Sequence, residues 1–293
     1  MNSILHDIMT ISIDGGLFML EYPEVLTISE QLRNGIAGSV ASRVLPPSKA
    51  HKFCWFNGDP AGYDAALRGV RAATAEGFGI FVEIAFDNGY RLCFNDGVNV
   101  RLMPSVKVPR DYQLLIEFED GRALVFTVAM YGGIILHNGS YDNEYYLKSR
   151  RAVSPFSDRF KERFYRLLDE SKPSLSVKAF LAAEQRFPGI GNGVLQDILL
   201  ESGINPKRKI STLRDLEKDN LLRCVIEVLR NMAAHGGRDT EKDIYGRQGG
   251  YKVCLSRNTL ASGCPKCGGK ITKETYLGGS IYYCPICQPI IKQ

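Results

Sequence analysis

The sequence predicts an α+β protein of several domains: an N-terminal β-sandwich or barrel with flanking helices, a C-terminal helical domain and a β-hairpin held by a metal ion. Apolar residues recur with a period of two from about residue 37 to 150, and with helical spacing from about 155 to 235. Two CxxC pairs lie near the C-terminus. We expect an extension at 1–18, a β-rich domain at 19–150, a helical domain at 151–240, and a connector with the hairpin at 241–293.

The β-rich part contains two clear hairpin signals. Residues 81–86 and 90–94 flank an Asp-Asn-Gly turn, and residues 114–118 and 123–126 flank a Glu-Asp-Gly turn. Such alternating runs around glycine turns are typical of antiparallel sheets. Less distinct predictions are a strand or an unstructured leader at 3–13, a helix at 27–36 and a short helix at 63–70.

The helical part is divided by residues that break or cap helices. Pro188 and Gly189 interrupt the helical spacing, and Gly203 ends a second run. Either Ser174 or Ser176 is the expected N-cap of the helix before this break. The predicted helices cover 157–168, 176–186 and 193–202, and one or two more lie in 213–234.

The cysteine motif runs Cys264-Pro265-Lys266-Cys267, then sixteen residues, then Cys284-Pro285-Ile286-Cys287. Two CxxC pairs at this separation supply four thiolates to a tetrahedral structural Zn²⁺ site. Residues 271–277 and 280–283 are the expected arms of the hairpin between them. The alternative is two disulfides, which a reducing compartment would disfavour.

Composition sets broad limits on the class of protein. The chain is 44% hydrophobic and 24% charged, an ordinary globular balance, with a formal net charge of +5. It lacks a long apolar run and a secretory signal pattern, so we expect no membrane association and a cytoplasmic, nucleoid-associated protein. The four cysteines outside the motif are expected to be buried free thiols: Cys54, Cys93, Cys224 and Cys254.

Several segments together resemble one family. The segment Lys178-Ala179-Phe180-Leu181 with Gly189-Ile190-Gly191-Asn192 resembles the helix-two-turn-helix motif of the formamidopyrimidine-DNA glycosylase/endonuclease VIII (Fpg/Nei) family. Met19-Leu20-Glu21-Tyr22-Pro23-Glu24-Val25 is similar to its Met-Pro-Glu-Leu-Pro-Glu-Val opening. Tyr245-Gly246-Arg247 and the cysteine motif fit its C-terminus. The resemblance covers about residues 19–293.

The resemblance implies binding to double-stranded DNA, damaged or abasic, by a monomer. Glycines and free N–H groups before a helix attract phosphate, so Gly191 and Asn192 are expected phosphate contacts; the alternative is that Asn192 is only an N-cap. Residues expected to assist DNA binding are Lys178, Tyr131, Lys266 and Lys273, with Lys270 as a further hairpin cation. Tyr131 could stack into the gap left by a flipped base, or be a core aromatic.

The sequence departs from the family at its reactive positions. Leu20 matches the family's N-terminal proline, whose amine forms a Schiff base, and Phe78 matches a phosphate-binding lysine. Ala129-Met130-Tyr131-Gly132 replaces an Arg-Arg-Phe-Gly wedge, and the hairpin tip Gly278-Gly279-Ser280-Ile281 lacks the family's arginine. Glu21 matches the family's acidic residue, which assists opening of the sugar ring. The alternative is that Glu21 has only a structural role.

Three hypotheses follow. The first is a DNA-binding relative of these glycosylases without Schiff-base or lyase chemistry. The second is a monofunctional DNA N-glycosylase in which Glu21 activates water. The third is a zinc-finger interaction protein with no nucleic-acid role.

Overall fold

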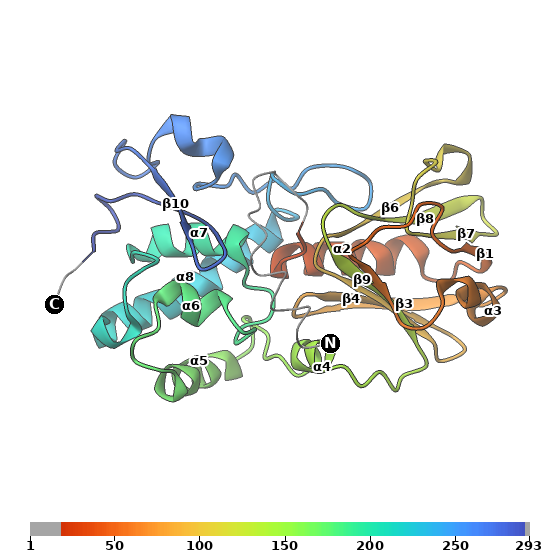
Figure 1. The fold of residues 1–293 in the computed structure, drawn as a ribbon, viewed down its shortest axis with the longest axis horizontal. Coiled ribbons are helices and arrows are strands. Elements are labelled where there is room, and N and C mark those ends of the chain that lie inside the picture. The colour runs from red at the N-terminus through yellow and green to blue at the C-terminus, as the bar shows by residue number, and fades with distance from the viewer. Residues whose placement is uncertain (1–18, 291–293) are drawn as a thin grey trace. The chain divides into compact units, whose positions relative to one another are not determined.

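The computed structural model describes residues 19–290, which form two compact units (Figure 1). Within this range the β unit comprises 19–152 and 232–251, and the helical unit comprises 153–231 and 252–290. The boundary after residue 231 falls inside helix α8 (Asp215–Ala234). The four domain ranges derived from the sequence stay predictions, and the expected strand or leader at 3–13 lies outside the described residues.

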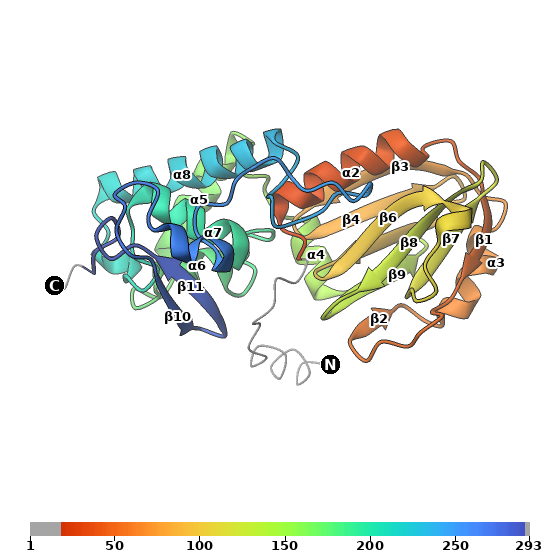
Figure 2. The same ribbon diagram turned by 90° about the horizontal axis from the view of Figure 1, so that it is seen from above.

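The β unit is a sandwich of two sheets (Figure 2). One sheet has the order β1 (Ala41–Leu45), β7 (Leu114–Phe118), β8 (Arg122–Val128), β6 (Val98–Pro104). The other has the order β2 (Cys54–Phe56), β9 (Gly132–His137), β5 (Arg91–Asn95), β4 (Phe81–Phe86), β3 (Ala72–Phe78). Both predicted hairpins are confirmed, because β4 pairs with β5 and β7 with β8 in antiparallel register. Only the pairing of β2 with β9 is parallel among these neighbours.

One apolar core joins the inner faces of both sheets to helix α2 (Tyr22–Ile36). Val25, Ile28 and Leu32 on one side of α2 are at most 1% exposed, which follows their helical spacing. The helix packs mainly on β3. The remaining helical pieces of this unit are η1 (Pro60–Gly62), α3 (Tyr63–Leu67), η2 (Ser105–Lys107) and α4 (Glu144–Arg150).

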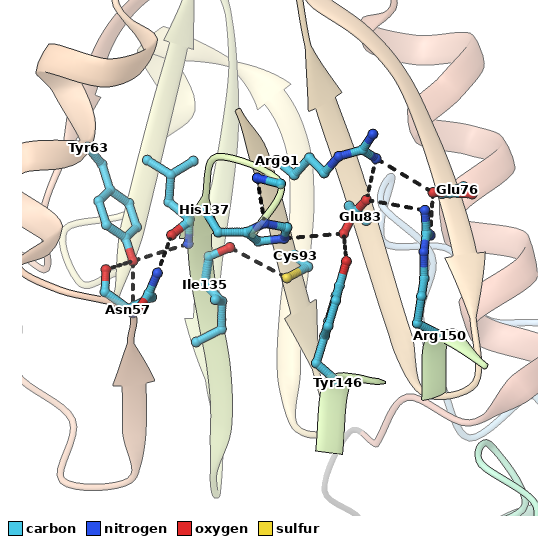
Figure 3. A network of polar contacts seen from close by, with 12 residues as sticks. Asn57, Tyr63, Glu76, Glu83, Arg91, Cys93, Ile135, His137, Tyr146 and Arg150 are labelled. Atoms are coloured by element: carbon cyan, nitrogen blue, oxygen red, sulfur yellow. Dashed lines mark hydrogen bonds and ion pairs between the residues drawn. The ribbon is translucent and has the colours of Figure 1, made fainter. Parts of the chain in front are cut away.

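A polar network attaches α4 to the outer face of the five-stranded sheet (Figure 3). The buried carboxylate of Glu83 accepts hydrogen bonds from Arg91 at 2.8 Å and from the Tyr146 hydroxyl at 2.7 Å. The Nε2 atom of His137 lies 3.5 Å from the same carboxylate. Burial alone would raise the pKa of Glu83, but these donors and Arg150 lower it to about 2. Glu83 is therefore an ionised anchor for α4.

The helical unit contains α5 (Arg159–Glu170), α6 (Val177–Ala182), α7 (Asn192–Ser202), η3 (Ile210–Thr212), most of α8, η4 (Arg257–Ser262) and the hairpin β10 (Thr272–Tyr276)–β11 (Gly279–Tyr283). Ser176 caps α6 by accepting from the Ala179 N–H, which decides between the two predicted caps. Helix α6 ends at Ala182, before the predicted residue 186, because Ala183 is extended and the next two residues, Glu184 and Gln185, adopt φ values of 56° and 50°. Residues 215–234 form one helix. Across residues 19–290, no helix combines the length and apolar composition needed to cross a membrane.

A glycine on β3 sets the distance between this strand and α2. A Cβ atom at Gly77 would lie 2.7 Å from Val25 Cγ1 and 2.8 Å from the Val25 carbonyl oxygen. We therefore expect Gly77→Ala to lower the free energy of unfolding by about 1–3 kcal/mol through overpacking. Urea unfolding followed by Trp55 emission measures this, because Trp55 lies in the same unit.

Gly62→Ala is the matched control for this variant. A Cβ atom at Gly62 meets nothing within 4 Å, and its φ is −80°. An equal loss of stability in both variants would contradict the packing explanation.

Candidate nucleic-acid interface

The four motif cysteines converge at the base of the finger hairpin, our name for β10–β11. Their Sγ atoms all lie within 4.8 Å of one another. The Sγ atoms of Cys264 and Cys287 are 3.8 Å apart, and those of Cys267 and Cys284 are 3.5 Å apart. A tetrahedral site with metal–sulfur bonds of about 2.3 Å has sulfur–sulfur edges of about 3.8 Å. The cluster therefore has the dimensions of a structural metal site.

Backbone hydrogen bonds fold each CxxC pair into a tight turn. The Gly268 N–H donates to the Cys264 carbonyl and the Gln288 N–H to the Cys284 carbonyl, both at 2.8 Å. Burial opposes ionisation of the Cys264 thiol, but N–H groups of Lys266 and Cys267 lower its pKa to about 7. A thiolate is thus accessible at this ligand before any metal is considered.

The finger hairpin is attached to α7 by side-chain amides. Gln196 donates to the Ser280 carbonyl at 3.1 Å and accepts from the Tyr282 N–H at 3.1 Å. Buried Asn205, just after α7, donates to the Gln288 carbonyl at 3.0 Å. Lys207 forms an ion pair with Glu274 on β10. The position of the hairpin therefore depends on α7 as well as on the cysteine cluster.

The predicted phosphate contacts lie where α7 begins. Its N-cap is Gly191, so exposed Asn192 is the first helical residue and is not the cap. A Cβ atom at Gly279 would lie 2.4 Å from Asn192 Nδ2 and 3.5 Å from Lys178 Nζ. The structure therefore brings Asn192, Lys178 and the hairpin turn together, and only glycine at 279 permits this approach.

Lys178 differs from a solvent-facing cation. It is 4% exposed, and its ammonium donates to the Tyr276 carbonyl and lies 5.9 Å from the centre of the Tyr276 ring. Burial lowers its pKa to about 8. It therefore holds the hairpin turn and adds positive potential behind Asn192, with little surface of its own.

The predicted hairpin cations are placed differently from one another. Lys266 is exposed but forms an ion pair with Glu201 at 2.9 Å. Lys273 is exposed on β10. Exposed positions suit long-range attraction of an anion.

Leu20 and Glu21 lie at the start of α2 in the β unit. The Leu20 side chain is 2% exposed, and its backbone N–H donates to the Asp96 carbonyl at 2.8 Å. Glu21 is 6% exposed at the N-cap position of α2. Asp96 itself has a φ of 52° and accepts from the Tyr145 hydroxyl at 3.0 Å.

Arg238 is the cation of this region, and sequence analysis missed it. Its guanidinium donates to Glu24 at 2.8 and 3.0 Å and lies 3.5 Å from Glu21 and 3.8 Å from Glu241. It is 3% exposed. No spacing rule links positions more than two hundred residues apart, and the only signal was the Gly236-Gly237 pair that precedes it.

Tyr131 and Phe78 occupy opposite ends of the outer face of the five-stranded sheet. Tyr131 is half-buried just before β9, and its ring centre lies 6.3 Å from that of Trp55. Phe78, at the end of β3, stacks on Phe81, and the Arg150 guanidinium lies 4.5 Å from its ring centre. A cation therefore lies over the Phe78 ring.

These observations define a class: a two-unit protein with a β-sandwich and a helical unit that carries a four-cysteine finger. No family model matches the chain. A formamidopyrimidine-DNA glycosylase of Thermus thermophilus is 28% identical over 284 residues, covering 92% of this chain and 98% of that protein. A formamidopyrimidine-DNA glycosylase of Prochlorococcus marinus is 33% identical over 147 residues. This match covers 47% of this chain, and the chain spans only about half, 50%, of the length of that protein.

Solved structures agree on the fold. The Lactococcus lactis Fpg in complex with abasic-site DNA matches with a TM-score of 0.77 at 20% identity, over 92% of this chain and 99% of that one. The Thermus thermophilus MutM (Fpg) structure matches with a TM-score of 0.77 at 24% identity, over 93% and 100%. The chain is thus similar to formamidopyrimidine-DNA glycosylases over nearly its whole length, and it shares the fold of their solved structures.

We expect the purified protein to carry one metal ion per chain and Cys267→Ala to lose it. Without the metal the finger hairpin has too small a core to stay folded, so trypsin should cleave after Lys270 and Lys273. Elemental analysis and limited proteolysis, with and without a chelator, measure both effects. Cys54→Ala, in the other unit, is the control and should keep the metal; an unchanged cleavage pattern after metal removal would contradict the assignment.

The Glu241 carboxyl predicts a pH dependence of stability. Burial, reinforced by Glu24 and Glu21, raises its pKa from the ordinary 4.5 to about 8. Between pH 4.5 and about 8 the folded state keeps a proton on Glu241 that the unfolded state releases. The contribution of Glu241 to the free energy of unfolding is therefore complete below pH 4.5 and is lost as the pH rises through about 8. Stability of the β unit should fall by about 1–3 kcal/mol across this window.

Glu241→Gln should remove much of this fall, leaving stability near pH 5 unchanged and raising it near pH 8.5. Asp96, whose pKa burial raises to about 7, retains part of the slope. Urea unfolding at a series of pH values, followed by Trp55 emission, measures the difference. A variant with the same slope as the unaltered protein would refute the role of Glu241.

Proposed function

We propose that this chain binds damaged or abasic double-stranded DNA and lacks the Schiff-base and lyase chemistry of its family. The observation that carries the proposal is the state of Leu20. The position matched to the family's nucleophilic proline holds a buried residue whose nitrogen is a peptide amide, already hydrogen-bonded to Asp96 at 2.8 Å. An amide nitrogen is not a nucleophile, so no covalent intermediate can form there.

The surroundings of Glu21 favour binding over hydrolysis. A general base needs a free carboxylate oriented towards a water molecule at the sugar. Glu21 is 6% exposed and lies beside the Arg238 guanidinium, whose charge stabilises the carboxylate in place. We therefore assign Glu21 to the buried ion cluster and retain the monofunctional glycosylase as the outcome that the tests below can reveal.

The beginning of α7 supports phosphate binding. Asn192 is exposed at the first turn, the N-cap is a glycine, and Lys178 lies behind it. Helix N-termini carry free N–H groups and a partial positive charge that favour an anion. Relatives of this chain have been solved in complex with abasic-site DNA. For the cysteine cluster we propose Zn²⁺, because four thiolates in a tetrahedral arrangement prefer it.

Borohydride trapping beside a binding assay tests the proposal. We expect the metal-loaded protein to bind a duplex with one abasic site and to form no borohydride-stable covalent complex. A trapped complex would identify a nucleophilic amine and refute the loss of lyase chemistry. Base release from an oxidised duplex that disappears in Glu21→Gln would instead establish the hydrolytic enzyme, and failure to bind any duplex at low salt would favour a protein-interaction role.

Asn192→Ala should weaken binding about 5- to 30-fold, equally for duplexes of different sequence, because a lost phosphate contact carries no base information. Fluorescence anisotropy at two salt concentrations measures the affinities. Asn138→Ala, at an exposed position in the β unit, is the control and should bind normally. A loss restricted to one sequence would contradict the phosphate assignment.

A further inference from the structure

A second group of metal-binding side chains lies on the outer face of the five-stranded sheet, in the β unit. Glu83 on β4 is directly opposite Cys93 on β5, and Cys93 is directly opposite Ile135 on β9. His137 is two residues beyond Ile135, so its side chain projects from the same face of the sheet. The pairing register therefore gathers a carboxylate, a thiol and an imidazole from three adjacent strands (Figure 3).

Two tyrosines cover this group and separate it from solvent. Glu83, Cys93 and His137 are each at most 5% exposed. The Tyr141 ring stacks on the His137 imidazole with ring centres 5.5 Å apart. The Tyr146 hydroxyl, on α4, donates to the Glu83 carboxylate at 2.7 Å. Polar atoms buried in this way normally have hydrogen-bond partners, because an unsatisfied one costs free energy.

The Nε2 atom of His137 departs from this rule. It is buried and has no hydrogen-bond partner among residues 19–290. It faces the Glu83 carboxylate, but their separation of 3.5 Å is longer than the roughly 2.7–3.2 Å of an N–H···O hydrogen bond. The Cys93 thiol makes a long contact of 3.6 Å with the Ile135 carbonyl. The hydrogen bonds of the network therefore satisfy Glu83 but do not explain the buried imidazole nitrogen.

The dimensions and the chemistry of the group suit a metal ion. One ligand atom from each of the three side chains lies within 4.8 Å of the other two. Tetrahedral Zn²⁺ with bonds of about 2.0–2.3 Å has ligand–ligand edges of about 3.3–3.8 Å, so a small contraction of the group would enclose the ion. Carboxylate, thiolate and imidazole are all ligands that Zn²⁺ accepts in proteins.

We propose that Glu83, Cys93 and His137 form a second zinc site, which is structural and weaker than the finger cluster. The inference goes beyond the proposed function and does not depend on it. Zn²⁺ would join β4, β5 and β9 beneath α4.

Protons must leave the ligands before the ion can bind. The Nδ1 atom of His137 accepts from the Gly139 N–H at 3.1 Å, which places the proton of the neutral ring on Nε2. Zn²⁺ at Nε2 moves this proton to Nδ1, so the Gly139 N–H loses its acceptor, and the Cys93 thiol releases its proton to solvent. The site also has one thiolate where the finger has four. It therefore fills after the finger, when zinc is added to the purified protein.

Cobalt(II) is the probe for this site, because it takes the same ligands as Zn²⁺ and absorbs visible light. The full chain, with its finger metal in place, is titrated with Co²⁺ while absorption is recorded. We expect visible bands and a thiolate-to-cobalt charge-transfer band that saturate at about one added Co²⁺ per chain and disappear when Zn²⁺ is added. Absence of the charge-transfer band at saturating Co²⁺ would overturn the proposal and leave the group as a hydrogen-bonded anchor only.

Substitutions assign the band to this site and not to the finger. Cys93→Ser should lose the charge-transfer band, and His137→Gln should weaken Co²⁺ binding about tenfold or more. Cys54→Ala, in the same unit but outside the group, is the control and should keep the band. Urea unfolding without added metal, followed by Trp55 emission, confirms that each variant is folded. A folded Cys93→Ser protein that keeps the band would place the cobalt in the finger and refute the proposal.

The unaltered protein provides a test that needs no variant. When zinc binds Nε2 of His137, the Gly139 amide loses its hydrogen bond to Nδ1, so its NMR resonance should shift as the second zinc ion is added. The urea midpoint of the β unit should rise over the same range, because the ion binds the folded state. A Gly139 resonance that does not move at saturating zinc would contradict binding through His137.

Discussion

The β unit depends on a buried arginine that brings distant parts of the chain together. The backbone N–H and the guanidinium of Arg238 both donate hydrogen bonds to Glu24. The guanidinium also forms ion pairs with Glu21 and Glu241 and donates to the Met19 carbonyl. Removing one partner from such a cluster leaves an unpaired buried charge, which typically costs about 3–5 kcal/mol. The cluster thus fixes the start of α2 and the residues after α8 as one structure, and it places a cation beside Glu21.

In the helical unit, the cysteine cluster and side-chain amides hold the finger hairpin in place. The finger hairpin buries few apolar side chains of its own, so its position comes from the cysteine cluster and from Gln196, Asn205 and Lys207 around α7. The same α7 carries Asn192 at its first turn. The cysteine cluster and the proposed phosphate contact therefore both depend on the placement of one helix.

Periodicity and spacing predicted the sandwich, its two hairpins and the cysteine cluster, because these are local patterns. The length of α6 was overestimated, since Glu184 and Gln185 adopt left-handed φ values that their residue types do not signal. Arg238 and the Trp55–Tyr131 pair were not predicted, because each joins residues through tertiary contacts without a sequence period. The resemblance located Leu20, but only the structure supplies the hydrogen bond that occupies its nitrogen.

The turn of the finger hairpin restricts which residues can occupy it. Leu277 and Gly278 have positive φ values, and a Cβ atom at Gly279 would lie 2.4 Å from Asn192 Nδ2. A larger side chain at position 279, including a cationic one, would therefore push Asn192 aside before its own charge could contribute to binding an anion. Positive charge engineered into this tip would have to enter at a position other than 279.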